Sequence, residues 1–284
     1  MSLLADTASQ PSAFRRVVTT GPGAVSGLIV LFWFCIFLMQ YVWTPHDPYE
    51  MNFAAQLSGP TAQNLLGADH FGRDLLSRLL VGARGTLYVG FISVGIALSI
   101  GGLIGALAGY AGGFVSEGLM RIVDVLYAFP AILLALLLAA IYSPGTITAM
   151  VAIGIATIPI FARIMRSSVI SLRELEFVEA GRALGLSHAR ILWRHVVPGA
   201  FSPVIVQASL SLSVAVLAEA ALSFLGLGTP PQTPSWGSML REAQSFLAMS
   251  PYPAFVPGIA IMLTVLGLSL LGDGLRDMAD RRSG

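Results

Sequence analysis

The residue types that most often carry chemistry are sparse in this chain, and none is spaced as a catalytic motif requires. All 16 basic residues are arginines, so the chain contains no lysine. A Walker A phosphate-binding loop needs a lysine on the terminal phosphates of a nucleotide. The sequence also contains neither the H-E-x-x-H nor the G-x-S-x-G pattern. We therefore predict no catalytic residue and no cofactor bound by this chain, and any nucleotide-driven step must come from another polypeptide.

Metal-binding residues are equally sparse. The single cysteine, Cys35, lies inside an apolar stretch, which excludes a disulfide framework and a thiolate zinc cluster within the chain. The spacing of the four histidines is not that of metal ligands, and we expect them to be surface or loop residues. They are His46, His70, His188 and His195. We predict no metal site.

One ionisable residue, Glu219, lies within a long apolar stretch and is flanked by alanine and leucine. A carboxyl group at that depth is costly in a membrane and marks a candidate functional position. Two roles are open for it. Glu219 either joins helices through hydrogen bonds, which we favour, or lines a transport pathway.

The composition identifies the class of protein that must position these residues. Of the 284 residues, 55% are hydrophobic and only 11% are charged, and the mean hydropathy is +0.78. Soluble domains carry about a quarter charged residues, so we predict an all-α, polytopic membrane protein. The net charge of +1 leaves no surplus of basic residues to cover phosphates, which argues against a nucleic-acid partner.

Six apolar stretches have about the length that a helix needs to cross a bilayer, roughly 17 to 25 residues. They cover residues 24–43, 86–110, 119–142, 146–165, 203–225 and 255–271. We expect Pro130 to bend the third stretch near its start, and Pro159 to interrupt the fourth. An even number of spans places both termini on the same side of the membrane.

The arginines orient the predicted spans. Twelve of the 16 lie on the side of the termini, and only Arg73, Arg78, Arg84 and Arg241 lie on the other side. The positive-inside rule makes the side with 12 arginines cytoplasmic. We therefore expect cytoplasmic segments at residues 1–23, 171–200 and 272–284, and external segments at residues 44–85 and 226–254.

Both external segments contain a predicted short helix. In residues 70–84, leucines fall on one face and charged residues fall off it, which is typical of an amphipathic helix at the membrane surface. A helix packed at the start of the next span is the alternative that we favour. Residues 226–254 are rich in glycine and proline, and we expect irregular backbone followed by a short helix after Trp236.

Two local patterns predict contacts between spans. Glycines recur with a four-residue period at Gly101, Gly105, Gly109 and Gly113. Small residues on one face let a second helix approach closely, so we predict a helix-packing face that meets a helix of this chain or of a partner. Arg121 and Asp124, three residues apart, are expected to pair at the start of the third span.

The polar segment 171–200 is too charged to lie in lipid, where each charge at the bilayer centre costs about 2.5 to 3.5 kcal/mol. Helical spacing groups small or apolar residues on one face of a short helix. They are Phe177, Ala180, Gly181 and Leu184. Gly185 then stands where a left-handed helix cap is expected, and Ser187 caps a second helix, 188–197, that Pro198 ends.

The apolar face of this short helix has nothing in its own loop to cover it. One interpretation is that the helix rests on membrane lipid. The other is that it inserts into a groove of a cytoplasmic partner. Under either interpretation, Glu174, Glu176 and Glu179 lie in its first turns, where negative charge favours the helix dipole.

The segment from Glu179 to Pro198 resembles the EAA loop of the permease subunits of bacterial ABC importers, E-A-A-x3-G-x9-I-x-L-P. The glutamate, first alanine, glycine and proline are in register, whereas Gly181, His195 and Val197 depart from the pattern. Other stretches resemble the dipeptide, oligopeptide and nickel branch of these permeases. They are HFGRDLLSRLLVGAR at 70–84, GYAGG at 109–113, RIVDVLYAFP at 121–130, LSFLGLGTPPQTPSWGSML at 222–240 and GDGLRDMAD at 272–280.

The resemblance implies a type I ABC importer permease fold in the bacterial inner membrane, with residues 86–271 as its core of five spans and residues 44–85 and 226–254 periplasmic. It implies four kinds of partner: a homologous permease, two cytoplasmic ATPase subunits that carry ATP and magnesium, a periplasmic or lipid-anchored binding protein, and membrane lipid. The implied function is half of a translocation pathway for di- or oligopeptides, coupled to ATPase closure.

The resemblance also implies roles for single residues in the loop 171–200. Phe177, Ala180, Gly181 and Leu184 would pack into the ATPase cleft, with Glu179 paired to a basic group there. Gly185 would set the elbow, and Glu176 and Pro198 complete the coupling set. The glycine at position 181 loosens the helix by about 0.5 to 1 kcal/mol relative to alanine.

Two alternative functions remain. Within the same family, the substrate could be a nickel chelate or another small polar solute, because the binding protein largely sets specificity. An ion-coupled secondary carrier is the weaker alternative, since such carriers show internal repeats and several buried acids. The sequence shows no repeat, and Glu219 is the one acid that lies away from the start of a predicted span.

Overall fold

The structure is a computed structural model that describes residues 27–283 except 30, 33, 34, 37, 40 and 231, and whose side chains are not described at 139 and 278–283. The described chain is almost entirely helical. Its β-pairing is limited to one bridge between Ala68 and Asp74. The fold is therefore all-α, as the composition indicates.

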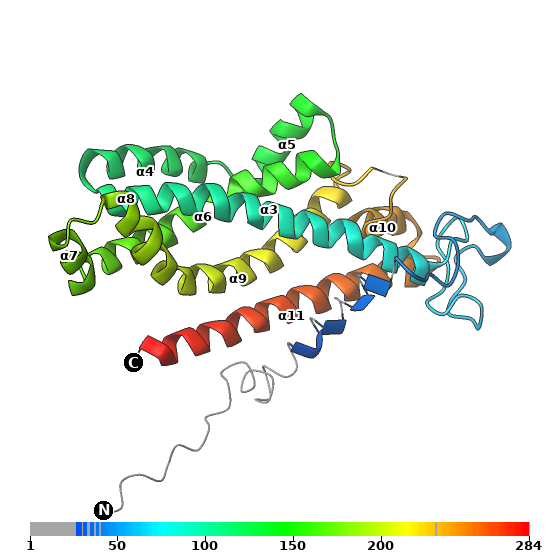
Figure 1. Cartoon of the computed structure of the whole chain (residues 1–284). Helices are drawn as coiled ribbons and strands as arrows, with labels where there is room; N and C mark the ends of the chain where they lie inside the picture. The colour runs from blue at the N-terminus through cyan, green and yellow to red at the C-terminus, as the bar shows by residue number, and fades with distance from the viewer. Residues whose placement is uncertain are drawn as a thin grey trace, which may run out of the picture.

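The helices follow one another with short connections and are labelled in Figure 1. Their bounds are η1 Phe53–Ala55, α3 Leu75–Ala111, α4 Gly113–Ala128, α5 Ala131–Tyr142, α6 Thr146–Arg173, α7 Glu176–Ala183, α8 His188–Ile191, η2 Leu192–Val196, α9 Val197–Phe224, α10 Trp236–Ala243, η3 Gln244–Phe246 and α11 Tyr252–Ser283. The long helices α3, α6, α9 and α11 run along the length of the molecule (Figure 1). Helices α7 and α8 lie at one end, and α10 and residues 44–74 lie at the other.

Among the residues that the structure describes, four helical segments are long and apolar enough to cross a membrane, and a fifth is obtained if the bent pair α4 and α5 is one span. The four are Leu75–Ala111, Thr146–Arg173, His188–Phe224 and Tyr252–Asp277. The first expected span, residues 24–43, lies partly outside the described residues. Those of its residues that are described between 27 and 39 are helical. Ile29 and Ile36 there pack in a cluster with Ala260 and Ile261 of α11.

The amphipathic helix expected at the membrane surface is instead the first part of α3. Asp74 caps α3 by accepting a hydrogen bond from the backbone N–H of Ser77 (2.8 Å), and the helix then continues to Ala111. Asp74 and Ser77, on the expected polar face, are only 4% and 0% exposed. Leu75 and Leu80 on the other face are also buried. The prediction of a surface helix is therefore wrong, and the favoured alternative of a packed helix agrees with the structure.

The third predicted span is broken at Phe129 and Pro130. Helix α4 begins already at Gly113, and it meets α5 at an angle of 83°. The residue before a proline is disfavoured in helical conformation, and Phe129 is extended, with φ −86° and ψ 124°. The expected Arg121–Asp124 pair does not form: Asp124 instead accepts a hydrogen bond from Arg163 of α6 (2.8 Å).

Helices α3 and α6 are packed backbone to backbone through the predicted glycine face. A β carbon at Gly101 or Gly105 would collide with the carbonyl oxygen of Ile158 or Ala162, and one at Gly109 would collide with Val169. Gly113 does not belong to this face, because it lies beyond the end of α3 with nothing within 4 Å of its missing side chain. The neighbour that the glycines meet is a helix of the same chain.

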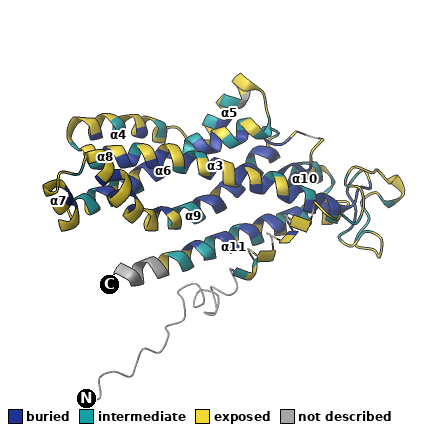
Figure 2. Ribbon diagram, in the orientation of Figure 1, coloured by how far each residue is buried: buried dark blue, intermediate teal, exposed yellow. Residues whose placement is uncertain are grey.

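Prolines interrupt fewer helices than expected. Pro159 lies inside α6, which continues to Arg173. A separate difference is at the C-terminus, where α11 continues through the expected polar tail to Ser283. Inside a helix bundle, neighbouring helices and side chains can satisfy the backbone groups that a proline leaves free. Figure 2 shows buried residues along the facing sides of α3, α6 and α9, and exposed residues over α4 and α7.

Candidate functional site

The short helix α7 (Glu176–Ala183) projects at the end of the molecule, at the tip of the connection between α6 and α9 (Figure 1). Its acidic first turn contains Glu176 and Glu179, and Arg182 lies in its last turn. At each end, the side-chain charge is opposite in sign to the helix dipole, which stabilises the helix. The left-handed turn expected after it is present, since Gly185 has φ +77°. The backbone N–H of Leu186 donates to the carbonyl of Gly181 (3.1 Å), which closes the cap.

The two faces of α7 have different surroundings. Val178 is 1% exposed and packs in the main core cluster, and Gly181 faces Leu186 and Ile191. The opposite face is open: Phe177 is 46% exposed and Leu184 is 82% exposed. Glu176, Glu179, Ala180 and Gly185 are exposed too.

Gly181 therefore does not belong to the exposed face on which the sequence pattern placed it. It forms the inner face with Val178, and the expectation that the loop covers none of its own helix is wrong on that side. The outer face that remains free within the described residues consists of Phe177, Ala180 and Leu184 with Glu179 beside them. This arrangement suits contact with another molecule.

Pro198 does not end the second helix of the loop. Ser187 caps α8 by accepting from the N–H of Arg190 (3.4 Å), and a π-helical turn, η2, then leads directly into α9. The N–H of Val197 donates to the carbonyl of Leu192, and Pro198 occupies the first turn of α9. A first-turn residue needs no N–H partner inside its helix, so the proline is accommodated there.

The base of the loop is attached to the end of α3. Arg173, the last residue of α6, donates from Nη1 to the carbonyl oxygen of Gly109 (2.9 Å). On the other side of α7, the hydroxyl of Tyr110 and the Nδ1 atom of His188 are hydrogen-bonded at 3.1 Å. The sequence pattern missed these residues, because each contact joins positions more than 60 residues apart.

Glu219 is fully buried near the opposite end of α9 and is satisfied within the chain. Thr86 of α3 donates to its Oε2 atom (3.0 Å), and Ser223 donates to its Oε1 atom (2.7 Å). The hydroxyl of Ser223 in turn accepts from the backbone N–H of Thr229 (3.1 Å). Glu219 thus links α3, α9 and the loop after α9, which matches the helix-joining role.

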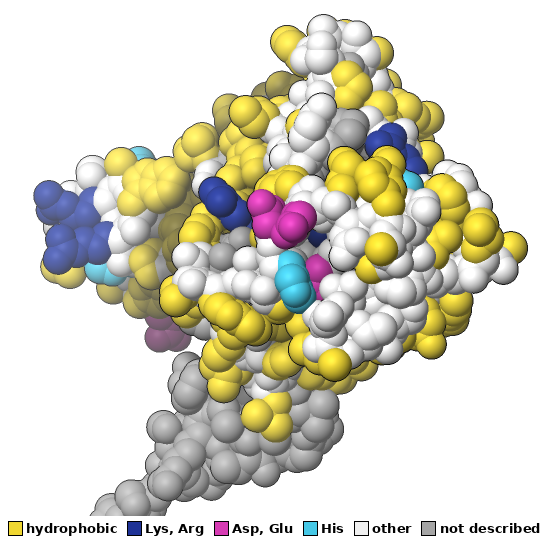
Figure 3. Space-filling model, turned by 90° about the vertical axis from the view of Figure 1, so that its right-hand side faces the viewer, with side chains coloured by type: hydrophobic (Ala, Val, Ile, Leu, Met, Phe, Trp, Pro, Cys, Tyr) yellow, Lys and Arg dark blue, Asp and Glu magenta, His cyan; other side chains and the backbone are white. Residues whose placement is uncertain are grey.

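A second cluster of charge joins residues 69–78 to α10. Arg73 donates to Asp69 (2.6 Å) and to Glu242 (2.7 Å), and Arg78 donates to the same Glu242 oxygen (3.1 Å). Figure 3, which looks at this end, shows acidic, histidine and arginine side chains gathered amid uncharged surface.

Asp69, His70 and Glu242 also have the geometry of a possible metal group, with ligand atoms within 4.8 Å of one another. The two arginines already neutralise both carboxylates, so the cluster does not support a cation site. His70 stacks on Phe246 with ring centroids 4.8 Å apart. Burial lowers the pKa of His70, against a weaker opposing effect of Asp69.

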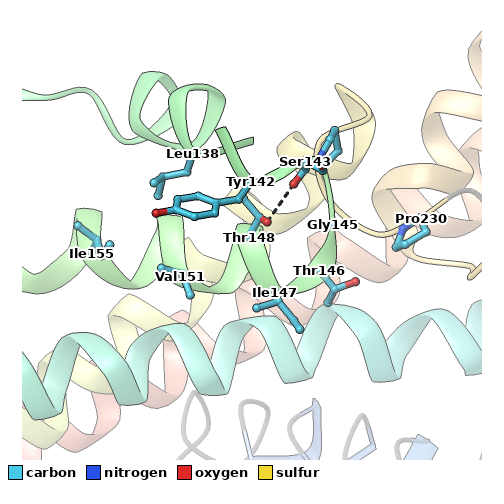
Figure 4. Close-up of a pocket in the computed structure, with 11 residues that line it drawn as sticks. Leu138, Tyr142, Ser143, Gly145, Thr146, Ile147, Thr148, Val151, Ile155 and Pro230 are labelled. Atoms are coloured by element: carbon cyan, nitrogen blue, oxygen red, sulfur yellow. Dashed lines mark hydrogen bonds between the residues drawn. The ribbon is translucent and has the colours of Figure 1, made fainter. Parts of the chain in front are cut away.

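A cavity of about 810 Å³ lies beside the turn between α5 and α6 (Figure 4). Its lining is Leu138, Tyr142, Ser143, Pro144, Gly145, Thr146, Ile147, Thr148, Val151, Ile155 and Pro230. The hydroxyl of Thr148 donates to the carbonyl of Ser143 (3.0 Å), the interaction drawn in Figure 4. No charged side chain is among these lining residues, so none of them could form an ion pair with a charged solute.

Curated relatives match nearly the whole chain. It is 43% identical to the dipeptide transport system permease protein DppC of Alkalihalophilus pseudofirmus over 94% of this chain and 88% of the relative. It is 41% identical to the glutathione transport system permease protein GsiD of Pectobacterium atrosepticum over 94% of this chain and 89% of the relative. The di/tripeptide permease DppC of Pseudomonas aeruginosa is 41% identical over 91% of this chain and 88% of its own.

Solved structures share the fold. An inward-facing structure of the MetNI methionine ABC transporter superposes with a TM-score of 0.58 at 20% identity, covering 71% of this chain and 96% of that chain. An amino acid ABC transporter with histidines gives a TM-score of 0.54 at 18% identity over 72% of this chain and 94% of that one. A family model described as binding-protein-dependent transport system inner membrane component matches residues 101–284. Together, the family model and the close relatives establish that the chain belongs to the family of inner membrane components of binding-protein-dependent transport systems.

Proposed function

We propose that this permease subunit imports di- or oligopeptides, with glutathione-like peptides in the same range, by forming half of a translocation pathway. Family membership makes the chain a non-catalytic, multi-pass component of an inner membrane transport system. The observation that carries the substrate proposal is the identity of 41 to 43% to permeases named for dipeptide and glutathione transport, over 94% of the chain. A nickel chelate or another small polar solute is the alternative within the family.

The outer face of α7 is proposed as the docking site for an ATPase subunit. Phe177 and Leu184 expose large apolar side chains at the tip of the molecule, and burial of their exposed apolar area against a partner is favourable by about 25 cal/mol per Å². Glu179 stands beside them and would pair with a basic group of the partner. Each of two ATPases would carry ATP and magnesium, and their closure would displace α7.

The proposed topology has six spans, with the α7 end in the cytoplasm. It counts the residues 24–43 as one span and the bent pair α4 and α5 as another, beside the four long helices. The arginine count supports this orientation, since the region from α6 to η2 contributes six of the 12 arginines on that side. Both termini would then be cytoplasmic, with residues 44–74 and α10 periplasmic.

Two further partners follow from this proposal. A homologous permease would complete the pathway, and the exposed apolar side chains of α4 and α5, among them Phe114, Ile122 and Leu133, are available to it or to lipid. A periplasmic or lipid-anchored binding protein would deliver the solute to the α10 end. These assignments rest on the family rather than on contacts within this chain.

Reconstitution tests the proposed function. The chain is purified together with the partner permease, ATPases and binding protein of its transport system and is placed in proteoliposomes. We expect uptake of a labelled dipeptide that requires both ATP and the binding protein. Uptake of nickel but not peptide would select the alternative substrate, and ATP-independent transport by this chain alone would refute the importer function in favour of an ion-coupled carrier.

A further inference from the structure

The end of α3 is held from two sides of the loop that carries α7. Helix α3 ends at Ala111. The carbonyl groups of its last four residues have no donor within the helix, so their hydrogen-bond partners must come from outside it. The N–H of Gly112 satisfies Ala108. The guanidinium of Arg173 supplies the next contact, at 2.9 Å from the carbonyl oxygen of Gly109 and 3.5 Å from that of Tyr110.

The charge of Arg173 suits this position. The end of a helix carries a partial negative charge on its free carbonyls, and a cation there is stabilising. Arg173 is half-buried, and its Nη1 atom also lies against Gly112, whose φ of +67° turns the chain into α4. Arg173 therefore ties the last turn of α6 to the last turn of α3.

The second contact comes from beyond α7. His188 is the first residue of α8, and its Nδ1 atom is 3.1 Å from the hydroxyl of Tyr110. The two rings meet edge to face, with centroids 6.0 Å apart and an angle of 67°. Tyr110 is partly buried against the main core cluster, whereas His188 is exposed, so the contact joins the start of α8 to the packed end of α3.

Between these two contacts, α7 and α8 behave as one packed unit. Val178 of α7 and Ile191 of α8 are each 1% exposed and belong to the same core cluster. Gly181 of α7 also lies against Ile191 of α8, so the helix that carries the outer face is packed directly on the helix that begins at His188. Arg173 and His188 contact neighbouring residues in the last turn of α3, Gly109 and Tyr110.

Helix α3 can carry the displacement across the molecule. Its 37 residues correspond to about 55 Å at 1.5 Å per residue. Glycines 101, 105 and 109 hold it tightly to α6, and its first turns carry Arg78 of the charge cluster at the opposite end. A rigid helix attached at both ends is suited to linking the two sides of a membrane.

We propose that Arg173 and the Tyr110–His188 pair are positioning residues that make the end of α3 move with α7. The inference rests on the proposed function, in which a partner ATPase displaces α7. It goes beyond that function by assigning the link to three side chains outside the ATPase-facing surface. Loss of the link would leave the rate of ATP hydrolysis intact, but fewer solute molecules would be transported per ATP hydrolysed.

The test measures solute molecules transported per ATP hydrolysed in proteoliposomes of the complete complex. Arg173→Gln removes the charge, Arg173→Lys keeps it, and Arg121→Gln removes an exposed charge from α4 as a matched control. We expect the ratio to fall about fivefold or more in Arg173→Gln, the lower range of a coupling between sites. Arg173→Lys should restore most of the ratio, and Arg121→Gln should leave it unchanged.

A milder variant guards against failure of Arg173→Gln to assemble. Tyr110→Phe deletes one hydroxyl from a side chain that is otherwise kept, and we expect a two- to threefold fall in the ratio, the lower end of the range for the loss of one hydrogen bond. His188→Ala should add little to Tyr110→Phe, because both remove the same contact.

Three outcomes would overturn the proposal. The first is an unchanged ratio in both Arg173→Gln and Tyr110→Phe while the wild-type complex transports with ATP; this sinks the link alone. The second is an equal fall in Arg121→Gln, which would indicate a general effect of charge. The third is a wild-type complex without ATP-dependent uptake, which would remove the proposed function together with the link.

Discussion

The hydroxyl of Thr86 in α3 donates a hydrogen bond of 3.0 Å to the Oε2 atom of Glu219 in α9, across 133 positions of sequence. Ser223 donates to the other oxygen, and the Glu219 side chain is fully buried, so both carboxyl oxygens are engaged by side chains of this chain. A buried acid with both oxygens satisfied connects helices more effectively than it contacts a passing molecule.

We predict that Glu219→Gln leaves the affinity and rate of transport unchanged, because the hydroxyls of Thr86 and Ser223 can rotate to suit an amide. Glu219→Ala, in contrast, strands both hydroxyls and should lower stability by about 1 to 3 kcal/mol. Thermal unfolding in detergent and uptake kinetics measure the two effects. The exposed Glu117→Ala is the control. A changed solute affinity in Glu219→Gln would restore the pathway role.

The glycine face predicts a strong dependence on side-chain size. Gly105→Val should prevent α3 from packing on α6, because even a β carbon there meets the backbone of Ala162 and the side chain of Met165. We expect loss of folded protein in the membrane. Gly95, in the same helix, has nothing within 4 Å of its missing β carbon. Gly95→Ala should therefore be tolerated, and equal yields of both variants would contradict the packing.

Local signals in the sequence predict local structure well. The turn at Gly185 and the cap of α8 by Ser187 depend on the residues around them, and both are present. Pro130 marks a break as expected, whereas two other prolines were misleading. Pro159 and Pro198 were expected to interrupt or end helices, but α6 runs through the first, and a π-helical turn precedes the second so that it falls in the first turn of α9.

Long-range pairing is the part that the sequence could not supply. Arg73 and Glu242 are 169 positions apart, and Arg163 pairs with Asp124 although Arg121 is nearer in sequence. Helical periodicity identifies which face of α7 is apolar, but packing decides which side is covered. That is why Gly181 was assigned to the outer face and lies on the inner one.

The turn after α7 predicts a selective effect on transport. Gly185 has φ +77°, which proline cannot adopt, so Gly185→Pro should misplace α7 and abolish transport while leaving membrane insertion intact. Asparagine tolerates the left-handed region better than other residues with side chains. Gly185→Asn should therefore retain much of the activity. Normal solute-stimulated ATP hydrolysis by Gly185→Pro would contradict a role of this turn in coupling.

Glu179, one of the two exposed acids of α7, gives a separate prediction. Glu179→Arg reverses the charge proposed to face a basic group of the ATPase, so we expect the ATPase to dissociate or to lose stimulation by solute. Copurification of the ATPase and its hydrolysis rate measure this. Glu174→Arg, just before α7, is the matched charge reversal, and an equal defect there would argue against a specific contact.

The burial of His70 predicts a pH dependence of stability. Its lowered pKa means that the folded protein favours the neutral imidazole. As the pH falls below about 6.5, the unfolded chain takes up a proton first, so stability falls until the pH passes the folded pKa. We expect the midpoint of thermal unfolding to drop more on acidification in the wild type than in His70→Gln. Parallel pH profiles would show that His70 is not responsible.

The charge cluster at the α10 end predicts a large loss of stability from one small change. Arg78 has a side chain only 2% exposed, and Glu242 accepts from both Arg78 and Arg73. Glu242→Ala would leave two buried guanidinium groups sharing Asp69 alone, and removing one partner of a buried pair costs about 3 to 5 kcal/mol.

Thermal unfolding of the purified complex measures that loss, with Glu50→Ala as the control, because Glu50 is an exposed acid in the segment that precedes α3. Replacing Arg78 and Glu242 together by Met and Leu should cost less than Glu242→Ala, because no unpaired charge remains at position 78. A double variant less stable than Glu242→Ala would mean that shape, rather than charge pairing, holds residues 69–78 to α10.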